Sequence, residues 1–130
     1  MPVKRWNPSG VAPPVAFYSH LAEAQTGSRV VAMAGQFGCR LDGSIPESLE
    51  DQFDLALENI LTLCKAAGAD GGQVLKLIVF LTDPPTDRAR IAAAMTRAFG
   101  ETPPAMTWIY VKGLFRPEVK VEIDVTLATF

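Results

Sequence analysis

Apolar side chains recur along the chain with two spacings, about 3.6 residues and two residues, which are the periods of helices and strands. The longest helical pattern runs from Ser48 to Ala67, where apolar residues return every three or four positions. Ser48 followed by Asp51 resembles a capping box at its start, and Gly68 stands at the usual position of a helix C-terminal glycine. The pattern therefore predicts an amphipathic helix whose apolar stripe, which includes Cys64, faces the core.

A second helical pattern begins after the segment 83–87 and ends near Phe99. Gly100 stands where this helix would stop, and the prolines at 103 and 104 prevent its continuation. Apolar side chains gather on one face of the predicted helix, so that face would also be buried. They are Ile91, Ala94, Met95, Ala98 and Phe99.

Three further segments carry the patterns of strands. Residues 74–81 are apolar on both alternations except at Lys76, so we expect a central strand that is covered on both faces. Lysine is rarely buried without a partner, and we expect an ion pair for Lys76. Residues 105–111 predict a second strand, and residues 119–127 predict a third, in which apolar and polar residues alternate strictly.

The N-terminal part of the chain is less regular. Residues 1–14 contain four prolines, which remove backbone donors, and this predicts an extended arm. Residues 15–22 and 29–37 carry strand patterns on either side of a turn at 25–28, and this spacing predicts a hairpin. The pattern leaves open whether residues 36–41 form a further short strand.

The order of these elements predicts an α+β fold with one mixed sheet. Right-handed crossovers would place both helices on the same face of that sheet. The other face would be uncovered, and it would expose one of two alternating sets of side chains. These are Met106, Trp108 and Tyr110, or Thr107, Ile109 and Val111. Apolar sheet faces of this kind usually mark an interface, so we expect a homo-oligomer with pockets between subunits.

Length and charge exclude several classes of protein. The chain has 130 residues, which favours a single domain over residues 1–130. Lysine and arginine number 12 against 14 aspartates and glutamates, a net charge of −2, so nucleic acid is not an expected partner. No apolar run reaches the ~18–20 residues of a membrane span, and no apolar segment follows the first charged residues as in a signal peptide. We therefore expect a cytoplasmic protein that does not bind membranes.

Metal and disulfide chemistry find little support in the sequence. The chain has two cysteines, Cys39 and Cys64, and one histidine, His20, which do not suffice for a zinc site within one chain. Two reduced thiols are expected in the cytoplasm, with one disulfide as the alternative. We predict that the protein uses neither a metal nor a cofactor.

Short motifs extend over nearly the whole chain. They are Asn7-Pro8 with Gly10, Tyr18-Ser19-His20, Ala34-Gly35-Gln36, Gln52 with Asn59-Ile60, Ala66-Ala67-Gly68-Ala69, Val74-Leu75-Lys76, Val79-Phe80-Leu81-Thr82-Asp83, Pro104-Ala105 and Val121-Glu122-Ile123. Their order and spacing together resemble the RidA/YjgF family, also described as endoribonuclease L-PSP or translation initiation inhibitor. The resemblance implies a chorismate-mutase-like fold and a homotrimer with clefts at its subunit interfaces.

The resemblance also implies an activity, the hydrolysis of reactive enamines and imines such as 2-aminoacrylate with release of ammonia. The family binds the substrate carboxylate with an arginine directly after the Pro-Ala pair, and Met106 occupies that position here. Ala34 replaces the family's serine, and Trp108 replaces a cysteine. Gly35 and Glu122 match the family. The chain is thus similar to the members that lack this arginine.

Glu122 and Tyr18, which also matches the family, are the candidate catalytic residues. Glu122 would orient or activate a water molecule, and Tyr18 would form a hydrogen bond with the substrate or with that water. The alternatives are that Glu122 is one of several polar residues on a solvated strand face, and that Tyr18 is an aromatic strand residue whose hydroxyl is exposed to solvent. His20 shares the predicted strand face of Tyr18 and titrates near neutrality, although a surface histidine is the alternative there too.

The candidate substrate-binding residues are Gly35, Ala34, Met106, Trp108 and Arg116. Met106, Trp108 and Tyr110 share a strand face, where they would line an apolar or aromatic pocket or pack in the core of a trimer. Arg116 lies in a loop and would supply a cation from a different position. Methionine offers no charge or donor to a carboxylate, so specificity would shift away from small imino acids.

Three functions are compatible with these residues. The first is a hydrolase of small reactive metabolites, an enamine or imine deaminase with altered specificity that acts through water bound by Glu122. The second is a non-catalytic protein that binds a small molecule or stabilises clients as a chaperone does. The third is an endoribonuclease, which the acidic balance and the single histidine oppose.

Overall fold

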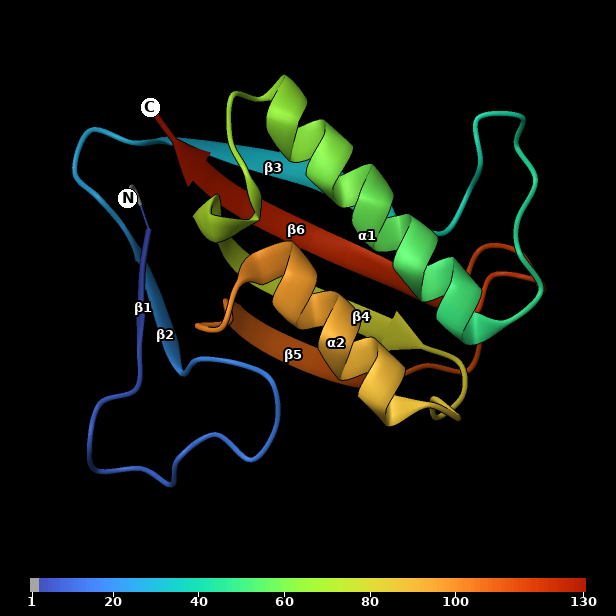
Figure 1. Cartoon of the computed structure of the whole chain (residues 1–130), viewed down its shortest axis with the longest axis horizontal. Coiled ribbons are helices and arrows are strands. Elements are labelled where there is room, and N and C mark those ends of the chain that lie inside the picture. Colours follow the sequence, from blue (N-terminus) through green and yellow to red (C-terminus); the bar gives the residue numbers. More distant parts are fainter. Residues whose placement is uncertain (1–2) are drawn as a thin grey trace.

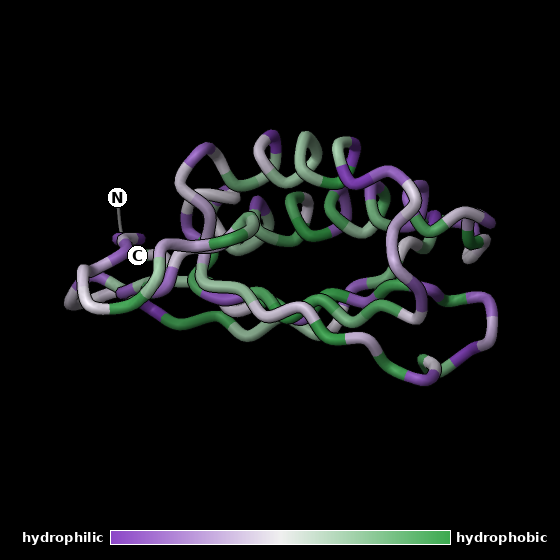
Figure 2. Tube along the Cα trace, turned by 90° about the horizontal axis from the view of Figure 1, so that it is seen from below, coloured by the Kyte–Doolittle hydropathy of each residue, from purple (hydrophilic) through white to green (hydrophobic). Residues whose placement is uncertain are grey.

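Two helices pack against one face of a four-stranded sheet in the computed structural model, which describes residues 3–130 (Figure 1). The elements of these two layers are β3 (Arg29–Gln36), α1 (Leu49–Ala66), the short 3-10 helix η1 (Gly71–Gln73), β4 (Val74–Leu81), α2 (Arg88–Phe99), β5 (Ala105–Tyr110) and β6 (Val121–Thr129). The strand order is β3-β6-β4-β5, in which only β4 and β5 are parallel. The predicted mixed sheet with both helices on one face is confirmed, and Figure 2 shows the two layers from the side.

A separate two-stranded sheet lies beside these layers. Its strands are β1 (Val3–Trp6) and β2 (Leu21–Ala24), which run antiparallel. The hairpin predicted for residues 15–22 and 29–37 is therefore wrong, because β2 begins later than expected and pairs with the N-terminal arm instead of β3. The arm supplies this partner because β1 ends before Pro8, so that all its residues keep their backbone N–H groups.

Arg5 of β1 joins the small sheet to the main layers. Its guanidinium donates hydrogen bonds of 2.8 to 3.2 Å to the carbonyl oxygens of Gly71, Val74, Phe99 and Thr102. These carbonyls belong to η1, the first residue of β4, the last residue of α2 and the loop that follows α2. Burial lowers the pKa of Arg5 to about 10, a value at which the side chain still carries its charge at neutral pH.

The segment after β3 forms a loop along α1. The possible strand at 36–41 does not continue beyond Gln36, where β3 ends. Asn59 of α1 donates its side-chain amide to the carbonyl oxygen of Cys39 at 3.0 Å, so a side chain takes the place of a partner strand. Gly38 is buried directly against the backbone of Gln52, where a larger residue would not fit.

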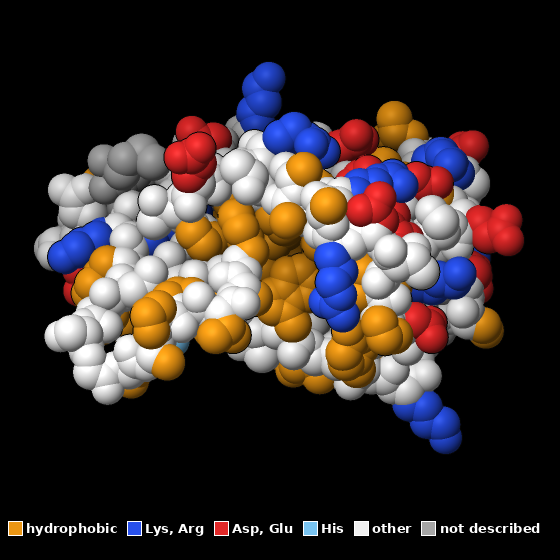
Figure 3. Space-filling view, turned by 60° about the horizontal axis from the view of Figure 1, so that its bottom comes forward, with side chains coloured by type: hydrophobic (Ala, Val, Ile, Leu, Met, Phe, Trp, Pro, Cys, Tyr) orange, Lys and Arg blue, Asp and Glu red, His pale blue; other side chains and the backbone are white. Residues whose placement is uncertain are grey.

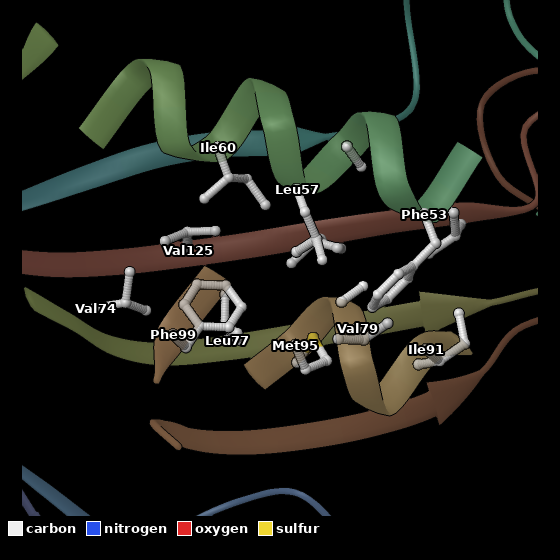
Figure 4. Close-up of a cluster of buried hydrophobic side chains, with 14 of the residues drawn as sticks. Phe53, Leu57, Ile60, Val74, Leu77, Val79, Ile91, Met95, Phe99 and Val125 are labelled. Carbon is white, nitrogen blue, oxygen red and sulfur yellow. The ribbon is translucent and has the colours of Figure 1, made fainter. Parts of the chain in front are cut away.

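The core lies between the helices and the sheet (Figure 4). Its members include Phe53, Leu57 and Ile60 of α1, Leu77 and Val79 of β4, Met95 and Phe99 of α2, and Val125 of β6. Cys64 is a buried free thiol in the same cluster, and burial raises its pKa. The buried amide of Gln52 donates to the carbonyls of Pro46 and Glu118. It also accepts from the N–H of Lys120, and so holds the loop before β6 against α1.

The first turn of α1 is capped and is bridged to α2. Ser48 caps the helix as expected, because its hydroxyl accepts a hydrogen bond from the N–H of Asp51 at 3.1 Å. The carboxylate of Asp51 pairs with Arg90 of α2 at 2.6 Å, and Asp54 pairs with the same guanidinium at 2.7 Å. These bonds fix the two helices relative to each other.

Glu50 anchors the loop that leads into α2. This buried carboxylate accepts hydrogen bonds from the N–H and the hydroxyl of Thr86 at 2.8 and 2.7 Å, and from the N–H of Asp87 at 3.3 Å. The hydrogen bonds from Thr86 lower the pKa of Glu50. The loop therefore places the first residue of α2, Arg88, at a defined point above the end of the sheet.

The register of β5 with β4 fixes the direction of the β5 side chains. Met106 and Trp108 pair in register with Leu77 and Val79, which are core residues. They therefore point toward the helices, where both pack against the core. The indole of Trp108 stacks on Phe53 of α1 with ring centroids 6.2 Å apart.

Thr107 and Ile109 of β5 lie on the opposite face, which no helix covers. Ile78 of β4 pairs with Thr107 on this uncovered face. Lys76 donates to the hydroxyl of Thr107 at 2.9 Å. It forms no ion pair with any residue in 3–130, so the expected ion pair is wrong and a hydroxyl satisfies the lysine instead.

Candidate functional site

One carboxylate on the uncovered face lies directly against the neighbouring strand. Glu122 of β6 alternates with the core residues Val121 and Ile123, so its side chain points away from the helices. Gly35 of β3 lies next to it, and a Cβ on Gly35 would be 2.5 Å from Oε2 of Glu122. Only glycine therefore leaves room for the carboxylate in this position.

The strand beside Glu122 is irregular at the same point. The register of β3 with β6 shifts between Met33 and Gln36, so Ala34 and Gly35 lie in the irregular stretch. The side chain of Gln36 donates to the carbonyl of Ala34 at 2.9 Å. Such irregularities re-aim backbone and side chains and are frequent beside functional sites. We call Ala34, Gly35 and Glu122 the Glu122 corner.

A pocket opens on the other side of the sheet, between the start of α2, the end of β5 and the segment that precedes β2. It has a volume of about 310 Å³, and Figure 3 shows the hydrophobic hollow with a basic side chain at its rim. Among residues 3–130, Arg88 is the one charged residue in the lining. The larger apolar and aromatic side chains around it are Phe17, Leu81, Ile91, Met95, Trp108 and Tyr110. We call this the Trp108 pocket.

The sequence-predicted site residues fall into separate groups within one chain. Ala34, Gly35 and Glu122 lie together on the uncovered face. Trp108 lines the pocket, and Met106 lies two residues earlier on the same face of β5, half-buried against the core. The sheet therefore separates the candidate catalytic carboxylate from the candidate substrate-binding pair.

Tyr18 and Arg116 belong to neither group. The hydroxyl of Tyr18 accepts a hydrogen bond from the N–H of Val15 at 3.3 Å, and its ring meets His20 edge-on at 5.5 Å between centroids. Arg116 forms an ion pair with Glu118 in the loop before β6. Both side chains are about half exposed, and Arg116 does not line the Trp108 pocket.

Part of the pocket was not evident from the sequence. Tyr110, which the strand pattern places on the same face as Trp108, lines the pocket beside Leu81 at the end of the sheet. Phe17 and Arg88 reach it from segments about 70 residues apart, which only the tertiary fold brings together. The sequence pattern does place Arg88 at the start of the second predicted helix, which begins after residue 87. Periodicity alone does not predict which side chains from other segments meet Arg88 there.

Residues 3–130 contain no cluster of three or more His, Cys, Asp or Glu side chains that would hold a metal ion. Cys39 and Cys64 are both free thiols. No helix in this described part of the chain is long and apolar enough to cross a membrane. The charged groups at the two sites are the carboxylate of Glu122 and the guanidinium of Arg88, and the pocket adds aromatic surface.

The arrangement of helices and sheet is that of Rid proteins of known structure. YyfB from Yersinia pestis, a member of the conserved Rid protein family, matches with a TM-score of 0.88 and 29% identity over 99% of this chain and 100% of that chain. TdcF from Escherichia coli, in a crystal structure with bound serine, matches with a TM-score of 0.69 and 30% identity over 95% of this chain and 94% of that chain.

Sequence similarity identifies the family of the chain. Residues 9–129 match the Endoribonuclease L-PSP family, and the chain belongs to this family, which confirms the resemblance to RidA/YjgF proteins. A relative from Escherichia coli carries the name reactive intermediate deaminase TdcF. It is 36% identical over 89 residues, which are 66% of this chain and 67% of that protein.

Proposed function

We propose that this protein is a reactive-intermediate deaminase that hydrolyses small imines and enamines, and that its substrates are larger and more apolar than 2-aminoacrylate. The observation that carries the proposal is the Glu122 corner, where Gly35 makes room for a carboxylate on the uncovered face. The name of the TdcF relative supports this reaction class. The apolar lining of the Trp108 pocket supports the change in substrate.

In the proposed reaction Glu122 acts on water as a general base. The oxygen of the water adds to the carbon of the C=N bond while a water proton passes to the carboxylate of Glu122. Glu122 then gives this proton to the nitrogen, and the proton of the new hydroxyl group also passes to the nitrogen as the C–N bond breaks, so that ammonia leaves and a carbonyl product remains. Glu122 thus returns to its ionised state, and the sequence of steps needs no oxidant or reductant.

Substrate selection would depend on the β5 positions that differ from the family. Met106 offers neither charge nor hydrogen-bond donors to a carboxylate, unlike the planar fork of an arginine. Trp108 presents a large aromatic surface to the pocket. We therefore expect weak activity on imines of small amino acids and higher activity on those with large apolar side chains.

A homotrimer would bring the two separated parts of the site together. The strand β5 is an edge strand, and Ile109 and Tyr110 at its end are 39% and 56% exposed. Packing the uncovered face of one subunit against this edge of the next would place a Glu122 corner beside each Trp108 pocket. Light scattering is expected to give about three times the chain mass of 14.0 kDa, and a mass near 14.0 kDa would contradict the shared site.

The hydrolysis is tested with an amino-acid oxidase that produces imines from leucine or phenylalanine, with semicarbazide to trap what remains. The wild type is expected to accelerate the loss of imine, and Glu122→Gln to reduce this acceleration by about 10²–10⁴-fold. Asp124→Asn is the matched control, because Asp124 is exposed on the same face of the same strand. Full activity of Glu122→Gln would reduce Glu122 to a surface residue.

A second candidate is a non-catalytic protein that binds a small apolar metabolite. The observation that favours it is the pocket of about 310 Å³, which within one subunit has no catalytic carboxylate in its lining. The same assay separates the two functions. Ligand binding with no acceleration of imine loss would support the binding protein and contradict the deaminase.

A further inference from the structure

We propose that Arg88 is the anion-binding residue of the Trp108 pocket, and that this pocket takes a small monocarboxylate with an aromatic or branched aliphatic body. The assignment rests on the proposed function in one respect, since it names the substrate class of that deaminase. The class is the imino acids with large apolar side chains, together with the 2-oxo acids that their hydrolysis yields.

Arg88 has a free guanidinium in the part of the chain that the structure describes. It is the first residue of α2, and it is exposed. It forms no hydrogen bond or ion pair with any residue in 3–130, whereas Arg5, Arg90 and Arg116 all bond carbonyls or carboxylates. Arg97 is also without such a partner, but it lies near the other end of α2 and does not line the pocket. Arg88 is therefore the arginine available to a ligand here.

The carboxylates near Arg88, either in the sequence or bonded to the loop before α2, are engaged by other donors. Asp87 caps α2 by accepting from the N–H of Arg90 at 3.0 Å. Asp83 accepts a hydrogen bond of 2.9 Å from the neighbouring threonine hydroxyl. Glu50 is buried under the loop before α2 and bonds that loop. None of the three forms an ion pair with Arg88, so the positive charge at the pocket rim is not neutralised locally.

The lining of the pocket matches one anionic group joined to an apolar body. A volume of about 310 Å³ is at the lower end of the ~300–1,000 Å³ found for small-molecule pockets, which indicates a small ligand. Phe17, Trp108 and Tyr110 offer aromatic surface, and Ile91 offers aliphatic surface. A single guanidinium fits the two oxygens of a carboxylate in a bidentate pair. The combination favours a monocarboxylate over a phosphate ester or a neutral molecule.

The position of Arg88 also defines which carboxylates fit. Met106 lies near the start of β5, whereas the pocket lies at its end, where Tyr110 pairs with Leu81. Four residues along a strand correspond to about 13 Å. A carboxylate on Arg88 is thus held far from the place of the family's arginine, and the body of its ligand lies across Trp108. The smallest imino acids have no such body and gain little from the pocket.

Calorimetric titration with stable probes tests the assignment without any turnover. The probes are 3-phenylpropanoate, its neutral amide, and propanoate, which lacks the ring. Wild-type protein is expected to bind 3-phenylpropanoate about tenfold or more tightly than either of the others, because a charge-assisted pair and ring burial act together. Arg88→Gln is expected to remove the preference for the acid over the amide, and Arg88→Lys to keep part of it.

Arg97→Gln is the matched control, an exposed arginine of the same helix outside the pocket, and it should bind all three probes as the wild type does. Equal affinity of the wild type for acid and amide would overturn the proposal. So would an unchanged preference in Arg88→Gln, or no measurable binding of 3-phenylpropanoate.

The outcomes separate this assignment from the proposed function. The expected binding pattern without imine hydrolysis would contradict the deaminase and leave the role of Arg88 standing. Imine hydrolysis without this binding pattern would contradict the role of Arg88 and leave the deaminase standing.

Discussion

The Glu122 corner and the Trp108 pocket lie on opposite faces of one sheet and differ in how they are built. The corner consists of one carboxylate, one glycine and one alanine. The pocket consists of large side chains and the guanidinium of Arg88. Under the proposed function, the handling of water and the holding of substrate would be separate parts of this fold, so that one could change while the other stays.

The two parts also differ in what a substitution would disturb. The corner depends on backbone shape, because the irregular stretch of β3 and the missing side chain of Gly35 create the space for Glu122. The pocket depends on side chains from α2, β5 and the N-terminal segment, of which Arg88 and Tyr110 are exposed, whereas Ile91 and Met95 belong to the core. We therefore expect small changes to matter more at the corner than at the exposed rim of the pocket.

The largest effect is expected for Gly35→Ala. The new Cβ would lie 2.5 Å from Oε2 of Glu122, so the carboxylate must move, and a displacement of about 1 Å in a catalytic group can reduce the rate about 10²-fold. Gly113→Ala is the control, because a Cβ there meets nothing within 4 Å. Imine hydrolysis and circular dichroism would be measured on both. Unchanged hydrolysis in a folded Gly35→Ala protein would show that the corner is not catalytic.

An intermediate effect is expected for Met106→Arg. An arginine on the helix-facing side of β5 would restore a partner for small carboxylates, and a charge-assisted pair should raise activity on imines of small amino acids about tenfold. Trp108 limits the gain, because it stands two residues further on the same face. Met106→Leu, which keeps the volume and adds no charge, should behave as the wild type. A correctly assembled Met106→Arg protein with no gain would favour the binding function.

The smallest effect is expected for Glu50→Gln, and it concerns the stability of the fold. Glu50 holds the loop that positions Arg88. Its folded-state pKa lies below the ordinary value because of the hydrogen bonds from Thr86. Glu50 therefore stabilises the fold at pH values above its unfolded-state pKa, and this contribution is lost as the pH falls through the folded-state pKa.

Thermal melting of the wild type and of Glu50→Gln from about pH 7 to pH 3 measures this contribution. The variant should melt at a lower temperature near neutral pH and lose less stability on acidification. Glu47→Gln, an exposed carboxylate just before α1, is the control. Parallel pH profiles of Glu50→Gln and the wild type would contradict the role of Glu50.

Local patterns were sufficient for the central part of the fold. The two helices and the strands β4, β5 and β6 follow from periodicity, and the right-handed crossover rule places both helices on one face. The N-terminal region was not predictable in this way. The pairing of β1 with β2 and the bonds from Arg5 to Gly71 and Phe99 are long-range, and the proline-rich arm carries no signal for them.

The candidate site, like the fold, was predictable from the sequence only in part. Gly35 and Glu122 were singled out by short motifs, and the structure places them in contact on two neighbouring strands. The shared strand face also predicted a pocket lined by Trp108 and Tyr110, and both residues line it. Phe17 and Arg88 were missed, because they meet only through the placement of the α2 crossover. Side-chain alternation along β5 gave two possible faces for Trp108, and only the packing against α1 decides between them.

The central claim is that the Glu122 corner of one subunit acts on a ligand in the Trp108 pocket of another. Two variants are needed: Glu122→Gln, and Ala92→Trp, which fills the pocket from the exposed side of α2. Each alone is expected to be nearly inactive in imine hydrolysis. The two variants are unfolded together in equal amounts and refolded. Random mixing then gives about a quarter of the sites an intact corner and an intact pocket, so we expect about a quarter of the wild-type rate. No recovery, with mixed trimers demonstrated by mass spectrometry, would contradict the claim.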